Sequence, residues 1–343
     1  MFDVMQDIER WQAEGERIAL ATVIQTWGSA PRGIGAKMAM TSDSRISGSV
    51  SGGCVEAAVV EAGVEVIESG RPRLLHFGVT DETAWGVGLA CGGKIEVFVR
   101  LLEPEPYTRI KRALDAERAV ASIAVVKGPG LGREILLEDE GGAIVGELGE
   151  GIDEKIVEEA RAALTEGVSR RVGAGDADIF IDVVVPAPTL VVVGGVHIAI
   201  ALTSLAKTMG YHTAVIDPRG VFGSEERFAH VDRLITAWPA EALQEVGLNR
   251  STAVAALTHD PKLDDPALRS ALQSPAFYVG ALGSRKTQEK RRKRLLQGGG
   301  LSEEHVARIW APIGLDIGSR TPEEIALAVM AQIVAARNGK LTR

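Results

Sequence analysis

The stretch that decides the fold of the second half of this chain reads Thr189-Leu-Val-Val-Val193, then Gly194-Gly195-Val196-His197-Ile198-Ala199. A short apolar run that ends in a glycine turn and continues into a helical pattern is typical of the first βα unit of a Rossmann-type domain. The turn offers backbone N–H groups and the helix start carries partial positive charge, so together they suit a phosphate. Asp217 stands 23 positions after Gly194, where an acid that contacts a ribose hydroxyl is expected.

The glycine turn departs from the usual G-x-G-x-x-G pattern, because Val196 occupies the place of the middle glycine. That glycine normally lets a pyrophosphate approach the backbone, and a β-branched side chain would push it away or change its pose. Two interpretations therefore stay open: a dinucleotide site, or a tight strand–helix turn without a ligand. Asp217-Pro-Arg219 is equally open, since it can contact a ligand or simply end a strand.

The second half of the chain alternates strand and helix patterns, which predicts a doubly wound parallel sheet. We expect an α/β fold in which residues 189–343 form a Rossmann-like parallel sheet with helices on both faces. Residues 1–102 are expected to form a smaller N-terminal α/β domain, and 103–188 an intermediate strand-rich segment or linker. The strands expected in the second half are 189–193, 212–216, 233–236, 251–257 and 277–281.

Helices are predicted where apolar residues recur at helical spacing. A capping box with proline at its first helical position, Thr321-Pro-Glu-Glu324, opens the last of them. The apolar stripes are Val4, Ile8 and Trp11; Val55, Val59, Ala62 and Val66; Ile198, Leu202, Leu205 and Met209; and Ile325, Val329 and Ile333. Other elements are expected as strands at 17–26, 36–41, 94–101, 119–126, 134–137 and 180–185, and as a helix at 153–166.

Two cysteines, Cys54 and Cys91, each lie beside paired glycines, Gly52-Gly53 and Gly92-Gly93. Cys54 is expected at the start of a helix, where a thiolate is stabilised. Small neighbours would leave the backbone open to a ligand, so this is a candidate site for a thiolate that carries sulfur or ligates a soft metal. The alternative is that both cysteines are buried and act as small apolar residues. Without a CxxC pair, the two cysteines cannot form a four-cysteine zinc site.

A basic run extends from Arg285 to Arg294, with seven Lys or Arg among ten residues. It predicts a solvated helix or a patch for an acidic partner, and nucleic-acid binding is a further interpretation. The preceding Gly280-Ala-Leu-Gly283-Ser284 places a second glycine turn at the carboxyl end of a strand, where open α/β sheets bind ligands. Ser284 and Arg285 can there touch the same anion. His259-Asp260 either faces the same crevice or is structural.

Composition narrows the class of protein. Acidic residues outnumber basic ones, 46 against 38, and the formal charge of −8 argues against a nucleic-acid binder. The longest apolar stretch, 189–206, is interrupted by glycines and polar residues, which predicts a buried strand, turn and helix rather than a membrane span. The opening Met1-Phe-Asp-Val-Met5 lacks the basic start and apolar core of a secretory signal. We therefore expect a cytoplasmic protein.

The motifs together resemble those of the XdhC/CoxI family, accessory proteins of xanthine dehydrogenase, aldehyde oxidoreductase and carbon monoxide dehydrogenase. Both ends of the chain carry the resemblance, whereas 103–188 contributes little. The family's turn usually reads Gly-Ala-Gly-His, where this chain has Gly194-Gly-Val-His197. The other matching motifs are Gly28-Ser-Ala-Pro-Arg32, Gly48-Ser-Val-Ser-Gly-Gly-Cys-Val-Glu56, Cys91-Gly-Gly93, Asp217-Pro-Arg219, Thr258-His-Asp260, Tyr278-Val-Gly-Ala-Leu-Gly-Ser-Arg285 and Ala311-Pro-Ile-Gly-Leu-Asp-Ile-Gly318.

The resemblance implies a cofactor chaperone rather than an enzyme. Family members bind the molybdenum cofactor, as molybdopterin or its dinucleotide form, and protect it while its sulfido ligand is installed. They then deliver it to the apo-enzyme of a molybdenum hydroxylase, which implies a cysteine desulfurase as a second partner. We also expect a homodimer.

On this hypothesis Cys54 and Cys91 hold the metal end of the cofactor, and their loops face the Rossmann edge across the domain interface. That edge would hold the phosphates. The expected cofactor-binding residues are Gly52, Gly53, Cys54, Cys91, Gly194, Gly195, His197, Asp217, Arg219, Ser284 and Arg285.

Two competing functions stay open. The first is an NAD(P)-dependent oxidoreductase, supported by the Rossmann half and Asp217 but without a clear proton donor. The second is a redox or nucleotide sensor without turnover.

Overall fold

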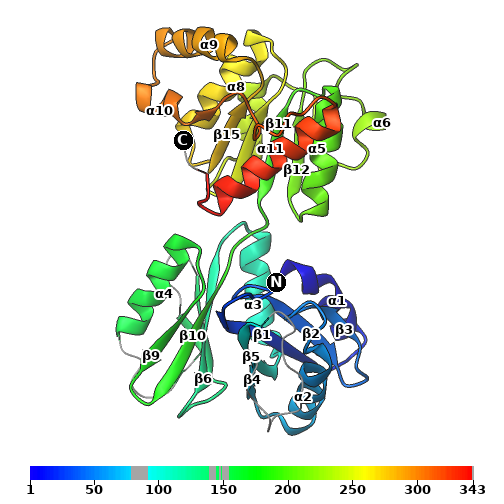
Figure 1. Cartoon of the computed structure of the whole chain (residues 1–343), viewed down its shortest axis with the longest axis vertical. Coiled ribbons are helices and arrows are strands. Elements are labelled where there is room, and N and C mark those ends of the chain that lie inside the picture. The colour runs from blue at the N-terminus through cyan, green and yellow to red at the C-terminus, as the bar shows by residue number, and fades with distance from the viewer. Residues whose placement is uncertain (79–91, 139–143, 147, 149–153, 342–343) are drawn as a thin grey trace. The chain divides into compact units, whose positions relative to one another are not determined.

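The computed structural model describes residues 1–78, 92–138, 144–146, 148 and 154–341. The chain folds as two compact units, Met1–Pro186 and Ala187–Arg343 (Figure 1). The three-part division expected from the sequence, with boundaries at 102/103 and 188/189, stays a prediction. Cys91 lies outside the described residues. Among the helices that the structure describes, none is both long and apolar enough to cross a bilayer.

The first unit is built on two antiparallel sheets, ordered β3-β2-β1-β5-β4 and β8-β7-β6-β10-β9. Its strands are β1 (Ile18–Trp27), β2 (Lys37–Thr41), β3 (Ile46–Gly48), β4 (Arg73–Phe77), β5 (Lys94–Leu101), β6 (Val120–Lys127), β7 (Glu134–Glu138), β8 (Ile144–Gly146), β9 (Arg170–Ala174) and β10 (Ala177–Val184). Its helices are α1 (Phe2–Ala13), α2 (Glu56–Ser69), α3 (Pro104–Asp115) and α4 (Glu154–Glu166).

Strand β1 is buried on both faces, since its residues alternate between two apolar clusters. Ile18 and Leu20 pack with residues of α1 and α3, while Ala19, Ala21 and Val23 pack with residues of α2. The helical stripes predicted for α1 and α2 are confirmed, because their apolar residues are buried in these clusters. Strand β1 therefore forms the centre of the first unit.

Three ion pairs among the described residues join the two sheets of the first unit, and the two most buried are Lys37 with Asp182 and Arg100 with Glu134. Lys37 on β2 lies with its Nζ 2.6 Å from Oδ2 of Asp182 on β10, and its side chain is 3% exposed. Arg100 on β5 forms two hydrogen bonds with Glu134 on β7, which also accepts one from Ser122 on β6. Buried charges are tolerated only when they are paired, so these contacts fix how the sheets meet.

The second unit is built on one parallel sheet ordered β13-β12-β11-β14-β15-β16. Its strands are β11 (Thr189–Val193), β12 (His212–Ile216), β13 (Arg233–Ile235), β14 (Thr252–Ala256), β15 (Tyr278–Ala281) and β16 (Ile309–Trp310). Its helices are α5 (His197–Thr208), α6 (Glu225–Phe228), α7 (Pro239–Val246), α8 (Pro261–Gln273), α9 (Arg285–Gln297), α10 (Glu303–Ala307) and α11 (Pro322–Arg337).

Helices cover both faces of this sheet, which confirms the predicted Rossmann-like class. Val191 and Val193 of β11 face a cluster formed with α7, α8 and α9, and Leu190 and Val192 face one formed with α5 and α11. Figure 1 shows α5 and α11 lying side by side across one face. The helical stripe predicted to include Met209 ends one residue earlier: α5 ends at Thr208, and Met209 is its 45% exposed C-cap residue.

Replacing Lys37 with Met should destabilise the chain by about 3–5 kcal/mol, because the Asp182 carboxylate loses its partner. The double variant Lys37→Met/Asp182→Leu should recover much of that loss, since no unpaired charge remains. Urea-induced unfolding measures both. Lys111→Met, which removes the surface partner of Glu9, is the control and should cost at most about 1 kcal/mol. If Lys37→Met and Lys111→Met lower the free energy of unfolding equally, the Lys37–Asp182 pair contributes no more to stability than a surface pair, which contradicts the prediction.

Candidate functional site

The carboxyl edge of the parallel sheet brings the predicted residues of the second unit together. The chain runs outward from β11 to β13 and then from β14 to β16 in the other direction, so the order reverses between β11 and β14. Ligands of open α/β sheets bind at such a switch point, beyond the carboxyl ends of the strands. Gly194, Asp217, Thr258 and Ser284 follow β11, β12, β14 and β15 and therefore share this edge.

The glycine turn after β11 is held by bonds inside the protein. The N–H of Gly194 donates to the carbonyl of Ile216 and that of Gly195 to Oδ2 of Asp217, both at 2.8 Å. A Cβ on Gly195 would collide with the carbonyl of Phe222. The expectation that both glycines offer N–H groups to phosphate is therefore not met in this conformation. The two glycines let the turn pack closely against the loop that follows β12.

Asp217 is fully buried and holds that loop. Its Oδ1 accepts hydrogen bonds from the Arg219 backbone and Nε at 2.9 Å, and its Oδ2 accepts one from Arg219 Nη2 at 2.8 Å. Burial raises the pKa of Asp217, but the hydrogen bonds from Arg219 and Gly195 outweigh it and lower the pKa below its ordinary value. Both carboxylate oxygens are thus engaged within the protein, and the Arg219 guanidinium is held above the Phe222 ring.

The start of α5 has no side-chain cap. Val196, its N-cap residue, packs against the apolar cluster shared by α5 and α11. His197 is 72% exposed, with Nε2 4.0 Å from a carboxylate oxygen of Glu323 on α11. The first N–H groups of a helix have no partner within the helix, so α5 retains the polarity of an anion site even though Val196 replaces a glycine.

The loop that carries Cys54 is organised by Glu56, the first residue of α2. Its carboxylate accepts hydrogen bonds from the N–H groups of Ser51, Gly52 and Gly53 at 2.8–3.0 Å. Ser49 and Ser51 donate their hydroxyls to it as well. The backbone around Cys54 is therefore already bonded, which corrects the expectation that small neighbours leave it open.

The hydrogen bonds to Glu56 change its acidity. Partial burial alone would raise the pKa of Glu56, but the Ser49 and Ser51 donors stabilise the carboxylate and lower its pKa to about 2. This role of Glu56 was not predicted from the sequence. The available signal was its position directly after Ser51-Gly-Gly-Cys-Val55, where a carboxylate can fold back on a glycine-rich loop.

Two glycine-rich segments of the first unit meet near Cys54. Arg32 donates from Nε to the carbonyl of Ser49 at 3.2 Å, which joins residues 28–35 to the Cys54 loop. Gly93, two residues after Cys91, packs against the carbonyl of Ser29. Cys54 is a half-buried free thiol at the edge of the cluster under α2. Within the described residues, no three His, Cys, Asp or Glu side chains are grouped to hold a metal ion.

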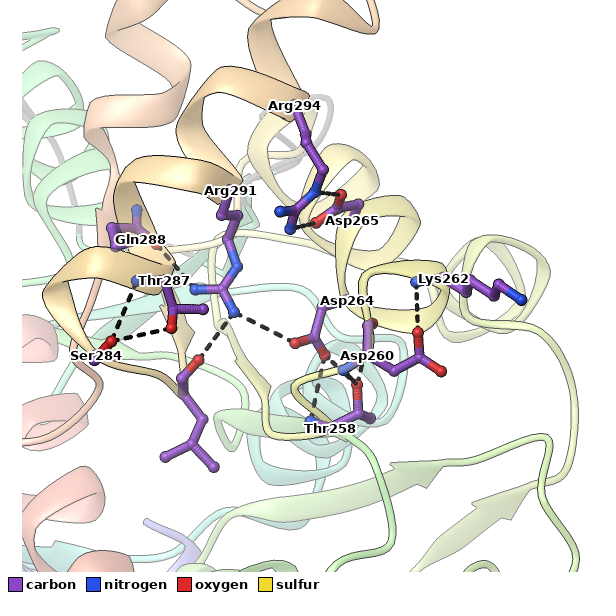
Figure 2. Close-up of polar contacts among 11 residues, drawn as sticks. Thr258, Asp260, Lys262, Asp264, Asp265, Ser284, Thr287, Gln288, Arg291 and Arg294 are labelled. Carbon is purple, nitrogen blue, oxygen red and sulfur yellow. Dashed lines mark hydrogen bonds and ion pairs between the residues drawn. The ribbon is translucent and has the colours of Figure 1, made fainter.

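The basic helix α9 is less solvated than its sequence suggests. Ser284 caps it and accepts a hydrogen bond from the Thr287 N–H, and the first helical residue, Arg285, is exposed. Arg291 is only 2% exposed and lies 3.4 Å from Asp264 on α8 (Figure 2). The prediction of a solvated helix is wrong for Arg291, which packs between α8 and α9. The available signal was Leu295, four positions after Arg291 on the same helix face and also buried.

His259 and Asp260 have different positions at the same edge. His259 is exposed and has a φ of 61°, in the left-handed region. Asp260 caps α8 by accepting a hydrogen bond from the Lys262 N–H at 2.9 Å. Asp260 therefore has a structural role, while His259 is exposed and lines a pocket at this edge.

Comparison with known proteins agrees with this geometry. The profile of the XdhC and CoxI family matches residues 11–78, and that of the XdhC Rossmann domain matches residues 190–333. The two matches together cover more than half of the chain and lie on the two units described above. The chain belongs to the XdhC and CoxI family.

Two relatives align over almost the whole chain. A Bacillus subtilis (strain 168) protein, named as a probable subunit of xanthine dehydrogenase, is 28% identical over 327 residues, 94% of each chain. The molybdenum cofactor insertion chaperone PaoD of Escherichia coli (strain K12) is 27% identical over 325 residues, 94% of this chain and 84% of its own length.

One solved structure has the same fold. A crystal structure of a xanthine dehydrogenase from Bacillus halodurans superimposes with a TM-score of 0.78 at 24% identity, covering 98% of this chain and 96% of the other.

Glu56→Gln should destabilise the chain at neutral pH by about 1.5 kcal/mol, because solvent screens part of the loss of charge-assisted hydrogen bonds. The folded pKa of about 2 lies below the ordinary 4.5, so the carboxylate stabilises fully above pH 4.5. That contribution is lost as the pH falls toward 2. The stability difference between wild type and variant, measured by thermal unfolding, should therefore shrink between pH 5 and pH 3.

Glu61→Gln, on the exposed face of the same helix, is the matched control and should change stability by less than about 0.5 kcal/mol at every pH. A Glu56→Gln cost that stays constant down to pH 3 would show that the charge of Glu56 does not hold the loop.

Proposed function

We propose that this protein binds the molybdenum cofactor, assists its sulfuration and inserts it into a molybdenum hydroxylase of the xanthine dehydrogenase or carbon monoxide dehydrogenase type. The observation that carries this proposal is the relationship, over 94% of the chain, to a molybdenum cofactor insertion chaperone. The cofactor is then cargo, carried as molybdopterin or its dinucleotide form, and the protein acts as a chaperone rather than as an enzyme.

The second unit supports the proposal through its sheet edge. The uncapped start of α5 beside His197 and the start of α9 at Ser284 and Arg285 are places where phosphate oxygens can meet N–H groups and positive charge. Arg219 is held at the same edge by Asp217. In this proposal Gly194 and Gly195 shape the edge, and the neighbouring helix starts and cations contact the phosphates.

The first unit supports the proposal through Cys54. A thiolate is a soft ligand suited to the molybdenum and sulfur end of the cofactor, and the loop that presents it is held by Glu56. We propose Cys91 as the second thiolate, with Gly52 and Gly53 bordering the same cargo. A cysteine desulfurase and the apo-enzyme would be the partners of a cytoplasmic homodimer.

An NAD(P)-dependent oxidoreductase is the alternative to a chaperone. The internal bonding of Asp217 counts against it, because neither carboxylate oxygen is left for a ribose hydroxyl in this conformation.

Cys54→Ala should lower the molybdenum that co-purifies with the protein by at least about tenfold, because the cargo loses a soft ligand. Cys91→Ala and the double variant test the second ligand. Metal analysis gives the loading, and activation of an apo-hydroxylase by the loaded protein gives the delivery. Thr165→Ala, on the exposed surface of α4 in the same unit, is the control and should load normally.

Unchanged loading in the double cysteine variant would remove both cysteines from the site. Co-purified nicotinamide with hydride transfer to a substrate, in a protein that contains no molybdenum, would contradict the chaperone and favour the oxidoreductase.

A further inference from the structure

A pocket of about 270 Å³ lies where α9 begins, beside the segment that follows β14. Lys286, Thr287, Lys290 and Arg291 line it from α9, and His259 lies among the residues on its other side. This volume lies close to the lower end of the usual range for small-molecule sites, about 300 Å³, so the pocket has ample room for a phosphate group. It lies beyond the carboxyl ends of β14 and β15, next to the switch point.

The lining of this pocket carries excess positive charge. Lys286 and Lys290 are exposed, and neither forms an ion pair with any described carboxylate. Arg294 is neutralised by Asp265 through two hydrogen bonds of 2.6 and 3.0 Å. The first turn of α9 contains no acid, so the positive end of the helix is not compensated from within.

Arg291 is a buried cation in the wall of the pocket, and one of its N–H donors has no hydrogen-bond partner among the described residues. Figure 2 shows its guanidinium pointing from α9 into the space beside Asp264 and Thr258. Its Nη1 and Nη2 donate at 2.9 Å to Gln288 and to the carbonyl of Leu282, but its Nε has no hydrogen-bond partner among the described residues. A buried donor left without a partner costs free energy, so a wall of this kind favours an added anion.

Asp264 pairs with Arg291 at a long distance and is shared with a second donor. Asp264 Oδ2 lies 3.4 Å from Arg291 Nη2, while Asp264 Oδ1 accepts a 2.6 Å hydrogen bond from the Thr258 hydroxyl. Burial lowers the pKa of Arg291 and raises that of Asp264, which is the direction expected when burial outweighs pairing. Arg291 and Asp264 therefore offset each other within the wall, and the positive charge left without a partner among the described residues is that of Lys286 and Lys290.

The start of α9 adds hydroxyl donors. Ser284 Oγ and Thr287 Oγ1 lie 3.0 Å apart at the pocket, and either can turn a hydrogen toward an anion. The backbone N–H groups of Arg285 and Lys286 precede that of Thr287, which Ser284 already caps. These hydroxyls, helix N–H groups and cations form the donor set that proteins use for phosphate.

We infer that this pocket is the seat of a phosphate group of the cargo, bound by the start of α9, Lys286, Lys290 and the Ser284 and Thr287 hydroxyls. The inference rests on the proposed function, and of the two helix starts named there it selects the start of α9. It agrees with the internal bonding of Gly194 and Gly195, whose N–H groups already have acceptors. Arg291 supplies positive charge beneath the anion.

The first experiment titrates the purified full chain with inorganic phosphate at low salt by isothermal titration calorimetry. Wild type should bind phosphate, and Lys286→Met/Lys290→Met should bind it at least about tenfold more weakly, because two charged contacts are lost. Lys293→Met removes the same charge from the same helix outside the pocket, so its affinity should stay within about twofold. Thermal unfolding checks that all three proteins are folded.

The second experiment measures how much molybdenum cofactor the same proteins retain. If the Lys286→Met/Lys290→Met variant retains less cofactor and Lys293→Met retains a normal amount, the pocket binds a phosphate group of the cofactor. The inference is overturned if wild type binds no phosphate, or if Lys293→Met weakens binding as much as the double variant. It is also overturned if the double variant loses phosphate but retains the cofactor normally, since the pocket then takes only free phosphate.

The same two experiments can contradict the proposed function without contradicting the phosphate site. If the phosphate affinities follow the expected pattern but wild type retains no cofactor, the anion seat is supported and the chaperone function is contradicted.

Discussion

The buried carboxylate of Asp217 is the interaction on which the functional edge of the second unit depends. A charged group without exposed surface must satisfy its hydrogen-bonding capacity inside the protein. Asp217 does so with the N–H of Gly195 after β11 and with Arg219 after β12. The two loops are thereby tied together, and the close approach of Gly195 to the Phe222 carbonyl follows from that link.

The same solution recurs at two other loops. Glu56 collects the N–H groups of the loop that carries Cys54, and Asp264 accepts two hydrogen bonds from Thr258 at the end of β14. In each case a single acid holds a loop that has no regular backbone ladder of its own. The hydrogen bonds that hold these loops need no ligand, which favours a site that is formed before its cargo arrives.

This arrangement separates the groups that hold the edge from those left to meet a ligand. Asp217 and the N–H groups of Gly194 and Gly195 are engaged within the protein, whereas the start of α5 has no side-chain cap and Lys286 and Lys290 have no described ion-pair partners. A Rossmann-like sheet can therefore keep its glycine turn for packing and take an anion at a neighbouring helix start. The fold alone does not decide which of the two is used.

The sequence by itself determined the elements whose physics is local. The β11–glycine–α5 unit, the alternating strands of the parallel sheet and the Thr321–Glu324 capping box were predictable, because periodicity and capping act within a few residues. Short strands such as β3 and β4, and helix α3, were not predicted, since their formation depends on neighbours already in place.

Only the tertiary structure decided which charged residues are buried and what they hold. Asp217 was expected to face a ligand and instead bonds the turn, and Arg291 was expected in solvent and instead lies between two helices. Arg291 and Asp264 are 27 positions apart, and no local pattern reports such a contact. Burial of a charge depends on the partners that the folded chain brings around it, and those partners come from distant parts of the sequence.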